Sequence, residues 1–429
     1  MESPANDDAP ATRRRRRFAW FIIGSLVLLL VLVASTLLYV AQPQRATRLI
    51  LDQLGRTLGL EITASAGDYH LRGTPTLSVR NVIAREPGAT KPLLRADRIF
   101  LSLPWSTIRA RGSDLTVEKI ELDRPVIDMG ALQHWLQQRP PGETRIPTLT
   151  RGLRIRDGSI VAAGWSVGDV TLDLPTLSPT QRVAAHVAGR YRTESLQAPF
   201  ALDVVLSVPS RNAAVGIAGD VSIVADTWQV PARIRLSGVL HLADRWRLDH
   251  AKLGAYVRYQ SGTTRMPFAF GAAGTLHGID AGLQLAPAGI AIRAHNVIPT
   301  LDAHGTIALA DVLTLQLAGV LPVWPDAWPA LPSPLAGSAS PLPFELRYAG
   351  RTDLTDIVEL RIDRDATHFD GGFRVPEVVS WIDADDAGSP LPPLDGRVTT
   401  PSIDIAGAQL QGVEVTLDDP RLEGAPAGQ

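Results

Sequence analysis

A serine in a hydrolase-like setting is the first candidate for chemistry in this chain. Residues 164–168 read GWSVG and match the G-x-S-x-G pattern, in which a strand-to-helix turn exposes a nucleophilic serine. Alternating apolar residues, Val170, Leu172 and Leu174, follow almost at once and predict a strand where the pattern requires a helix. We therefore interpret residues 164–168 as a hairpin turn and do not expect an enzyme.

Metal-binding side chains are scattered along the sequence. The nine His include no pair at helical spacing of three or four, and the chain has no Cys. Asp383, Asp385 and Asp386 precede Gly388, but their spacing differs from that of a calcium loop and no Glu closes it. No glycine-rich phosphate loop opens a predicted helix. We expect no metal and no cofactor, and a function performed by the shape of a surface.

The charge balance argues against a nucleic-acid partner. The chain carries 42 Lys and Arg against 44 Asp and Glu, for a formal net charge of −2. Five of the cations form one run, Arg13 to Arg17, so the remainder carries −7. Binding to a phosphate backbone needs a basic surface, which this composition does not supply.

The same arginine run adjoins an uncharged apolar stretch, residues 18–40. At about 1.5 Å per residue, this stretch is long enough to cross a hydrocarbon core of about 30 Å. Basic residues stay on the cytoplasmic side, so we predict a cytoplasmic tail at 1–17, a transmembrane helix at 18–40 and an exported remainder. A cleaved signal peptide is the alternative. The stretch is longer than a signal's apolar region, and Tyr39 occupies a cleavage position that favours a small residue.

Alternation with period two dominates the exported part and predicts about twenty strands separated by turn signals. In one strand Ile234, Leu236, Leu240 and Leu242 share a face that Gly238 interrupts. In another, Val358, Leu360 and Ile362 share a face. Strands at such short spacing are typical of an antiparallel sheet. The predicted fold class is mainly β, with a few short helices.

Helices and boundaries are predicted from fewer signals. Apolar spacing and stop residues predict helices at 45–60, 104–109 and 129–139. Residues 322–343 hold seven prolines together with Trp324 and Trp328, and we predict a crossover packed on the sheet. This crossover divides an N-terminal β region at 41–321 from a C-terminal one at 344–418, and residues 419–429 are a frayed tail.

Three segments together resemble a known family. They read PTLSVRNVIA at 75–84, LLRADRIFLSLPWSTI at 93–108 and VEKIELDRPVIDMGALQHWL at 117–136. This order, after a membrane helix, resembles the N-terminal pattern of the AsmA-like family. Residues 394–417, LDGRVTTPSIDIAGAQLQGVEVTL, are similar to a later repeat of that family.

The resemblance implies a bacterial inner-membrane protein, single-pass, with a cytoplasmic N-terminus. Its periplasmic part would be a long, curled β-sheet whose apolar face forms a groove, and its role would be in outer-membrane biogenesis. Larger relatives are thought to carry phospholipids between membranes. The implied partners are the inner membrane, phospholipid acyl chains and an outer-membrane assembly partner. On alternation alone, the residues expected to line the groove are Ile234, Leu236, Leu240, Leu242, Val358, Leu360 and Ile362.

Two alternatives stay open from the sequence. The same alternation also builds a closed sandwich, whose two sheets pack about 10 Å apart. Such a protein would act as a periplasmic scaffold that recruits partners by strand addition and affects outer-membrane protein assembly or targeting.

Overall fold

The computed structural model describes residues 51–419 apart from several short gaps. The gaps are 52–54, 57–58, 111–114, 139–145, 243–244, 280–281, 296–297, 327–337, 339, 384–392 and 406–407. The predicted membrane span at 18–40 and most of the predicted helix at 45–60 therefore lie outside the described residues. Within the described ranges, no helix is both long enough and apolar enough to cross a bilayer.

Short strands and two short helices make up the first part of the described chain. The elements are β1 (Glu61–Thr63), β2 (Ala66–His70), β3 (Thr76–Arg85), β4 (Leu94–Ser102), α3 (Trp105–Arg109), β5 (Thr116–Val117), β6 (Lys119–Asp123), β7 (Val126–Asp128), α4 (Met129–Gln137), β8 (Thr148–Leu149), β9 (Leu153–Val161), β10 (Ser166–Leu174), β11 (Val183–Arg192) and β12 (Gln197–Leu206). The third helix, α5 (Val375–Asp383), comes much later in the chain.

The strands lengthen toward the middle and shorten again. They are β13 (Asn212–Val224), β14 (Trp228–Leu242), β15 (Trp246–Ser261), β16 (Thr264–Ile279), β17 (Gly282–Ala294), β18 (Leu301–Leu309), β19 (Leu313–Leu321), β20 (Leu342–Gly350), β21 (Ile357–Arg364), β22 (Thr367–Arg374), β23 (Asp395–Ile405) and β24 (Ala408–Leu417).

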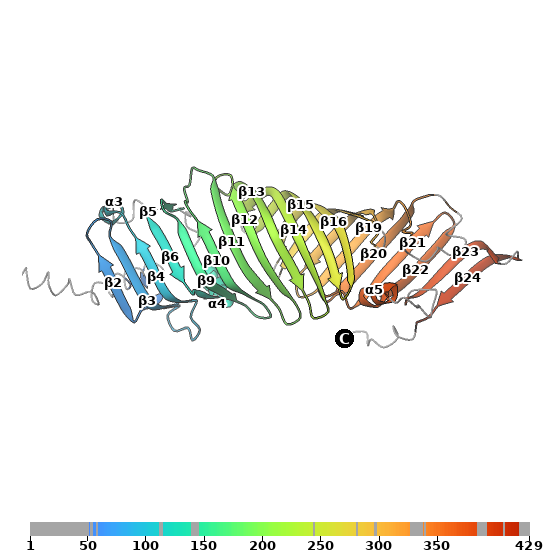
Figure 1. The fold of residues 1–429 in the computed structure, drawn as a ribbon, viewed down its shortest axis with the longest axis horizontal. Helices are drawn as coiled ribbons and strands as arrows, with labels where there is room; N and C mark the ends of the chain where they lie inside the picture. The colour runs from blue at the N-terminus through green and yellow to red at the C-terminus, as the bar shows by residue number, and fades with distance from the viewer. Residues whose placement is uncertain are drawn as a thin grey trace, which may run out of the picture.

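All but two of these strands form one continuous sheet of 22 strands. From β9 to β24 each strand pairs antiparallel with the next in sequence. The exceptions to antiparallel pairing lie near the N-terminus, where β6 and β7 run parallel to β9, and β5 runs parallel to β8. The sheet is long and twisted, and the slope of the strands reverses between β13–β16 and β20–β22 (Figure 1). The prediction of a mainly β, largely antiparallel fold is confirmed.

One face of this sheet is apolar over most of its length. Residues that lie directly opposite one another on neighbouring strands point to the same face. Such a row runs across the sheet from β3 to β18: Val79, Ile99, Leu122, Ile155, Leu172, Val187, Leu202, Gly219, Ile234, Ala255, Phe270, Ile292 and Leu301. We call the side that carries this row the apolar face.

The opposite side, which we call the polar face, carries acidic residues that alternate with Arg or His. One row runs Glu121, Arg154, Asp173, His186 and Asp203 from β6 to β12. The Arg154 guanidinium lies 3.3 Å from the Asp173 carboxylate, and the His186 ring lies 2.9 Å from Asp203. The two faces differ because successive side chains of a strand point to opposite sides.

Local departures from regular pairing bend the longest strands. The register shifts in each of the four successive pairs from β14/β15 to β17/β18. Bulges of this kind bend a strand and increase its twist. On β13, Gly219 has φ +153°, and a Cβ there would lie 2.1 Å from the Ala201 carbonyl oxygen. Only glycine fits this close approach of two backbones.

Most helix predictions are confirmed and one helix was missed. The predicted helices at 104–109 and 129–139 correspond to α3 and α4. Helix α5 was not predicted, although Val375, Val378 and Val379 have helical spacing. The strands on either side of the crossover, β19 and β20, pair with each other along their whole length, so the sheet continues past residues 322–343.

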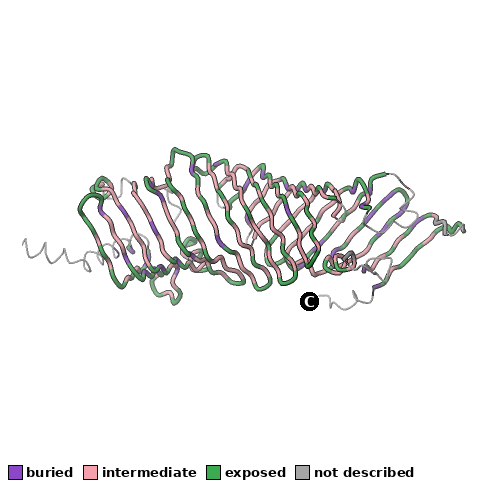
Figure 2. The backbone as a smooth tube through the Cα atoms, viewed as in Figure 1, coloured by how far each residue is buried: buried purple, intermediate pink, exposed green. Residues whose placement is uncertain are grey.

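Buried residues are few and lie in short patches rather than along the whole sheet (Figure 2). Within the described part of the chain, no large side chain is less than 2% exposed. A sandwich of two packed sheets would bury one face of every strand. All but two of the described strands instead share a single sheet, and the question becomes which parts of its apolar face are covered.

Candidate functional site: the uncovered middle of the apolar face

The N-terminal end of the apolar face is covered by segments that are not strands. Leu51 packs on Val79 and Val82 of β3, and each valine is only 3% exposed. Helix α4 lays Leu132 and Trp135 against the neighbouring cluster, which holds Leu60, Ala84 and Leu93. The helix starts where the Asp128 carboxylate accepts a hydrogen bond from the Ala131 N–H at 2.9 Å, a regular N-cap.

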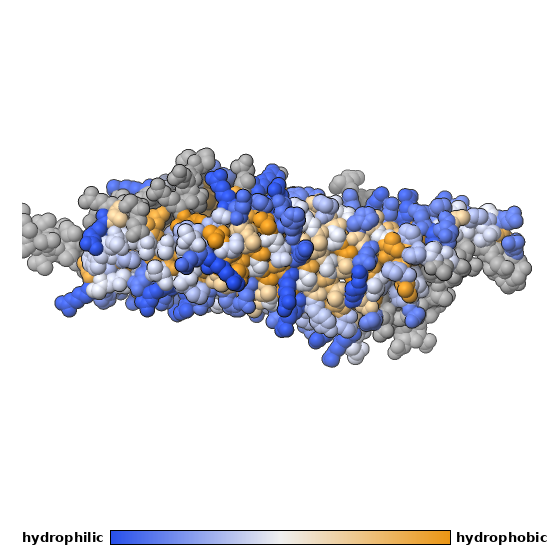
Figure 3. All heavy atoms as spheres, turned by 90° about the horizontal axis from the view of Figure 1, so that it is seen from above, coloured by the Kyte–Doolittle hydropathy of each residue, from blue (hydrophilic) through white to orange (hydrophobic). Residues whose placement is uncertain are grey.

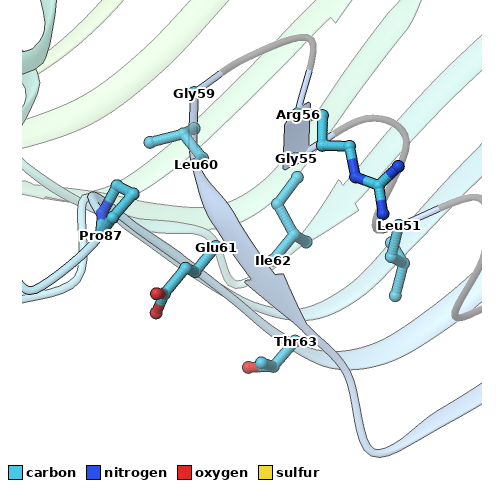
Figure 4. Close-up of a pocket in the computed structure, with 9 residues that line it drawn as sticks. All are labelled: Leu51, Gly55, Arg56, Gly59, Leu60, Glu61, Ile62, Thr63 and Pro87. Carbon is cyan, nitrogen blue, oxygen red and sulfur yellow. The ribbon is translucent and has the colours of Figure 1, made fainter.

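A cavity lies beside this cover. Its volume is about 570 Å³, and its lining residues are Leu51, Gly55, Arg56, Gly59, Leu60, Glu61, Ile62, Thr63 and Pro87. Figure 4 shows Glu61 and Thr63 on one side of β1 and Ile62 on the other. Ile62 contacts both N-terminal clusters. The cavity therefore adjoins the covered end of the apolar face.

The C-terminal end is covered in a similar way. Leu321, Leu342, Ile362 and Phe369 form a buried cluster, and Trp324 from the crossover packs on it. This confirms, for Trp324, the prediction that the crossover packs on the sheet; Trp328 lies outside the described residues. The Phe369 ring also fills the space over two glycines, since a Cβ on Gly371 or Gly396 would lie 2.7 or 2.8 Å from it.

The strands between these ends, β9 to β14, carry the same kind of apolar face without such a cluster. Leu172, Leu202, Ile217 and Leu236 are half-buried, and none of them belongs to a buried cluster in the described part of the chain. Seen from above, a band of hydrophobic side chains runs along the molecule between hydrophilic borders and is crossed in places by hydrophilic side chains (Figure 3). We call β9–β14 the uncovered middle.

No charged residue interrupts the apolar face of the longest strand in this middle. On β14 that face carries Trp228, Val230, Ala232, Ile234, Leu236, Gly238, Leu240 and Leu242. The alternate positions carry Gln229, Pro231, Arg233, Arg235, Ser237, Val239 and His241. An apolar surface that is partly exposed to solvent suits an apolar ligand.

The structure places all seven predicted groove residues on the apolar face, but in different surroundings. The seven residues lie on β14 and β21, and rows of cross-strand partners connect these two strands. One row contains Leu236 and Ile362, and another contains Leu240 and Val358. Ile234, Leu236, Leu240 and Leu242 lie in the uncovered middle, and Leu242 is 49% exposed. Val358, Leu360 and Ile362 belong to the covered C-terminal end, with Val358 at 3% and Ile362 at 8% exposure.

The polar face carries its strongest electrostatics beneath the covered N-terminal end. Arg98 lies 2.6 Å from Asp123 and 3.1 Å from Glu121, and Lys119 lies 2.6 Å from Glu121. The hydrogen bond from Lys119, with the nearby positive charges, lowers the pKa of Glu121. The hydrogen bond to Asp123 raises the pKa of Arg98. These groups fix strands to one another and face away from the apolar surface.

The catalytic candidate is a turn, as predicted. Gly164 adopts φ +80°, and the Ala162 N–H donates to the Trp165 carbonyl at 3.0 Å, closing the β9–β10 hairpin. Ser166 is the first residue of β10, with a strand after it and not the helix of a nucleophile elbow. In the described ranges, no group of three or more His, Asp or Glu is placed to hold a metal ion.

Comparisons of the chain with protein-family models, with curated proteins and with solved structures found no match.

Proposed function

We propose that this protein shields or passes the acyl chains of phospholipids on the uncovered middle of its apolar face. It would do so as a single-pass inner-membrane protein whose sheet lies in the periplasm and supports outer-membrane biogenesis. The observation that carries the proposal is the contrast along one face. Equivalent apolar positions form buried clusters at both ends of the sheet, whereas most of those from β9 to β14 are only half-buried and belong to no such cluster among the described residues.

The energetics favour an acyl chain as the occupant. Each CH₂ removed from water contributes about 0.8 kcal/mol, so a chain of about 16 carbons costs on the order of 13 kcal/mol to expose. The longest strand of the uncovered middle, β14, has 15 residues and is about 50 Å long at about 3.3 Å per residue. One leaflet of a bilayer core is about 15 Å thick, so an acyl chain fits along the strands.

The anchor and the compartment rest on the sequence. The arginine run and residues 18–40 predict the anchor, and the resemblance to the AsmA-like family implies the periplasm and the outer-membrane role. The first covering residue, Leu51, follows soon after the predicted span in the chain. Lipid leaving the membrane would therefore meet the N-terminal end of the apolar face first.

A double substitution tests the proposal. Leu236→Asp with Leu240→Asp places two carboxylates on the apolar face, and Ser237→Asp places one on the polar face of the same strand as a matched control. Photo-crosslinkable phospholipid should be recovered with the unaltered protein and with the control, and be lost with the double variant. Equal recovery with all three would refute the assignment.

A protein-interaction scaffold is the second candidate, and one observation favours it. Among the described residues, strand β24 pairs only with β23 and so forms an edge of the sheet, with Leu410 at 47% and Val415 at 38% exposure. Exposed edge strands pair readily with a strand from another protein. Mass spectrometry of the purified full-length protein separates the candidates. Bound phospholipid supports the first, and a lipid-free protein that retains a protein partner supports the second.

A further inference from the structure

Two pairs of aromatic rings lie along one rim of the apolar face. Trp165 and Tyr191 have ring centroids 5.9 Å apart, and Trp228 and Tyr259 have centroids 6.3 Å apart. Trp165 directly precedes β10 and Tyr191 is near the end of β11; Trp228 begins β14 and Tyr259 is near the end of β15. Strands β10 and β14 run in one direction, and β11 and β15 run in the other. The starts of the first two and the ends of the last two therefore lie along one rim of the sheet, which we call the aromatic rim.

The polar atoms of these four side chains are free to meet a ligand. None of them makes a hydrogen bond to another residue in the described ranges, whereas the Trp105 indole N–H donates to the Gly73 carbonyl at 2.9 Å. All four residues are half-buried, so each ring is partly in contact with the apolar face and partly in water. Burial also raises the pKa of the Tyr191 phenol above its ordinary value.

The cations at this rim point the other way. Arg192 directly follows Tyr191 on β11, and Arg265 lies opposite Gln260 at the start of β16, so both side chains lie on the polar face. Arg192 lies 3.2 Å from Asp169, and the Arg265 side chain is exposed. The rings, and not these guanidinium groups, therefore border the apolar face.

The opposite rim differs. Its aromatic residue in this region, Trp246, begins β15 and stacks over Gly278, where a Cβ would lie 2.6 Å from the indole nitrogen. No ring pair of the described residues includes Trp246. The two rims of the uncovered middle are therefore chemically unequal.

We propose that the aromatic rim holds the glycerol and ester groups of diacyl phospholipids, with their acyl chains extending across the apolar face toward the opposite rim. This rests on the proposed function and adds a fixed orientation to it. Trp and Tyr concentrate where an apolar layer meets water, with their rings in the apolar part and their polar atoms at the headgroup level. The pairs stand four strands apart, about 19 Å, so they form two stations along one track.

The absence of cysteine makes the orientation measurable on the full-length protein. Thr227→Cys places a label beside Trp228, and Arg211→Cys places one on the opposite rim. Each variant carries a single environment-sensitive fluorophore and is loaded with phosphatidylcholine. The lipid bears a nitroxide either on the choline group or at the end of one acyl chain.

The headgroup nitroxide should quench the label at position 227 severalfold more than the label at 211, and the chain-end nitroxide should show the reverse preference. Trp228→Ala with Tyr259→Ala should abolish that preference while bound lipid remains. Equal quenching at the two positions would overturn the fixed orientation and leave the proposed function standing. No quenching at either position by either lipid would count against both.

Discussion

The uncovered middle and the C-terminal end of the apolar face are built from the same alternating pattern, yet only the end buries it. Ile234 and Leu236 on β14 and Leu360 and Ile362 on β21 occupy equivalent positions on one continuous face. The difference comes from elements outside the strands, because Trp324 packs on β21 and its neighbours whereas no comparable cluster forms over β14 in the described part of the chain. Alternation therefore determines which face is apolar, and the connecting segments determine whether it is sealed.

This contrast implies two sources of stability. At the ends, side chains are removed from water and contribute as they do in an ordinary core. In the uncovered middle, the strands are held mainly by backbone pairing and by the fixed geometry of a few positions. Each prediction below compares one region with the other.

The largest difference in stability between the two regions should appear when a charged side chain is introduced into each of them. Ile362→Asp buries a carboxylate in the C-terminal cluster and should lower the free energy of unfolding by about 4 kcal/mol or more. Leu236→Asp leaves the carboxylate on an open surface and should cost about 1 kcal/mol or less. Urea unfolding of the two full-length variants measures both. Similar losses for the two would mean that the middle is sealed as well.

The second-largest effect on stability should come from backbone geometry in the uncovered middle. Gly219→Ala forces a Cβ to within 2.1 Å of the Ala201 carbonyl oxygen, at a φ that other residues avoid. We expect a loss of about 2–3 kcal/mol. Gly216→Ala on the same strand is the control, because no atom lies within 4 Å of its Cβ position. The control should change stability by less than about 0.5 kcal/mol in the same unfolding experiment.

Much of the sheet could be predicted from the sequence, since a period of two fixes the face of each side chain whatever lies over it. The strands that contain Ile234 and Val358, the hairpin at 164–168 and helix α4 all follow from local patterns. Gly238, interpreted from the sequence as a break in the apolar row, is instead the position over which a neighbouring side chain packs. A Cβ there would lie 2.7 Å from the Leu248 side chain, which fills the space.

The cover over the apolar face could not be predicted in the same way. It depends on where Trp324 and the residues before β1 fold back, and these are contacts between segments far apart in the sequence. Left-handed backbone positions within strands, such as Asn81 and Asp157, are also invisible to a two-residue period. The four aromatic residues of the rim gave no signal as a group, because the pairs form only when neighbouring strands align.

The smallest effect should appear with pH at the covered N-terminal end. The pKa of Glu121 is lowered in the folded protein, chiefly by its hydrogen bond from Lys119. A carboxyl group with a lowered folded pKa contributes stability above its unfolded value of 4.5, and that contribution is lost as the pH falls through the folded value. Arg98 and Lys119 are partly open to water, so we expect a loss under about 1 kcal/mol.

Hydrogen exchange of the β4 and β6 amides, followed between about pH 5 and pH 3, measures this loss where it arises. Glu121→Gln should flatten the dependence of these amides on pH, because the amide side chain does not titrate. Exchange in β13 and β14, where the pair formed by Arg233 and Asp220 is 74% and 66% exposed, should be the same in that variant as in the unaltered protein. If Glu121→Gln altered protection equally in both regions, the ends and the middle would form one cooperative unit, and the separation of their stabilities would be wrong.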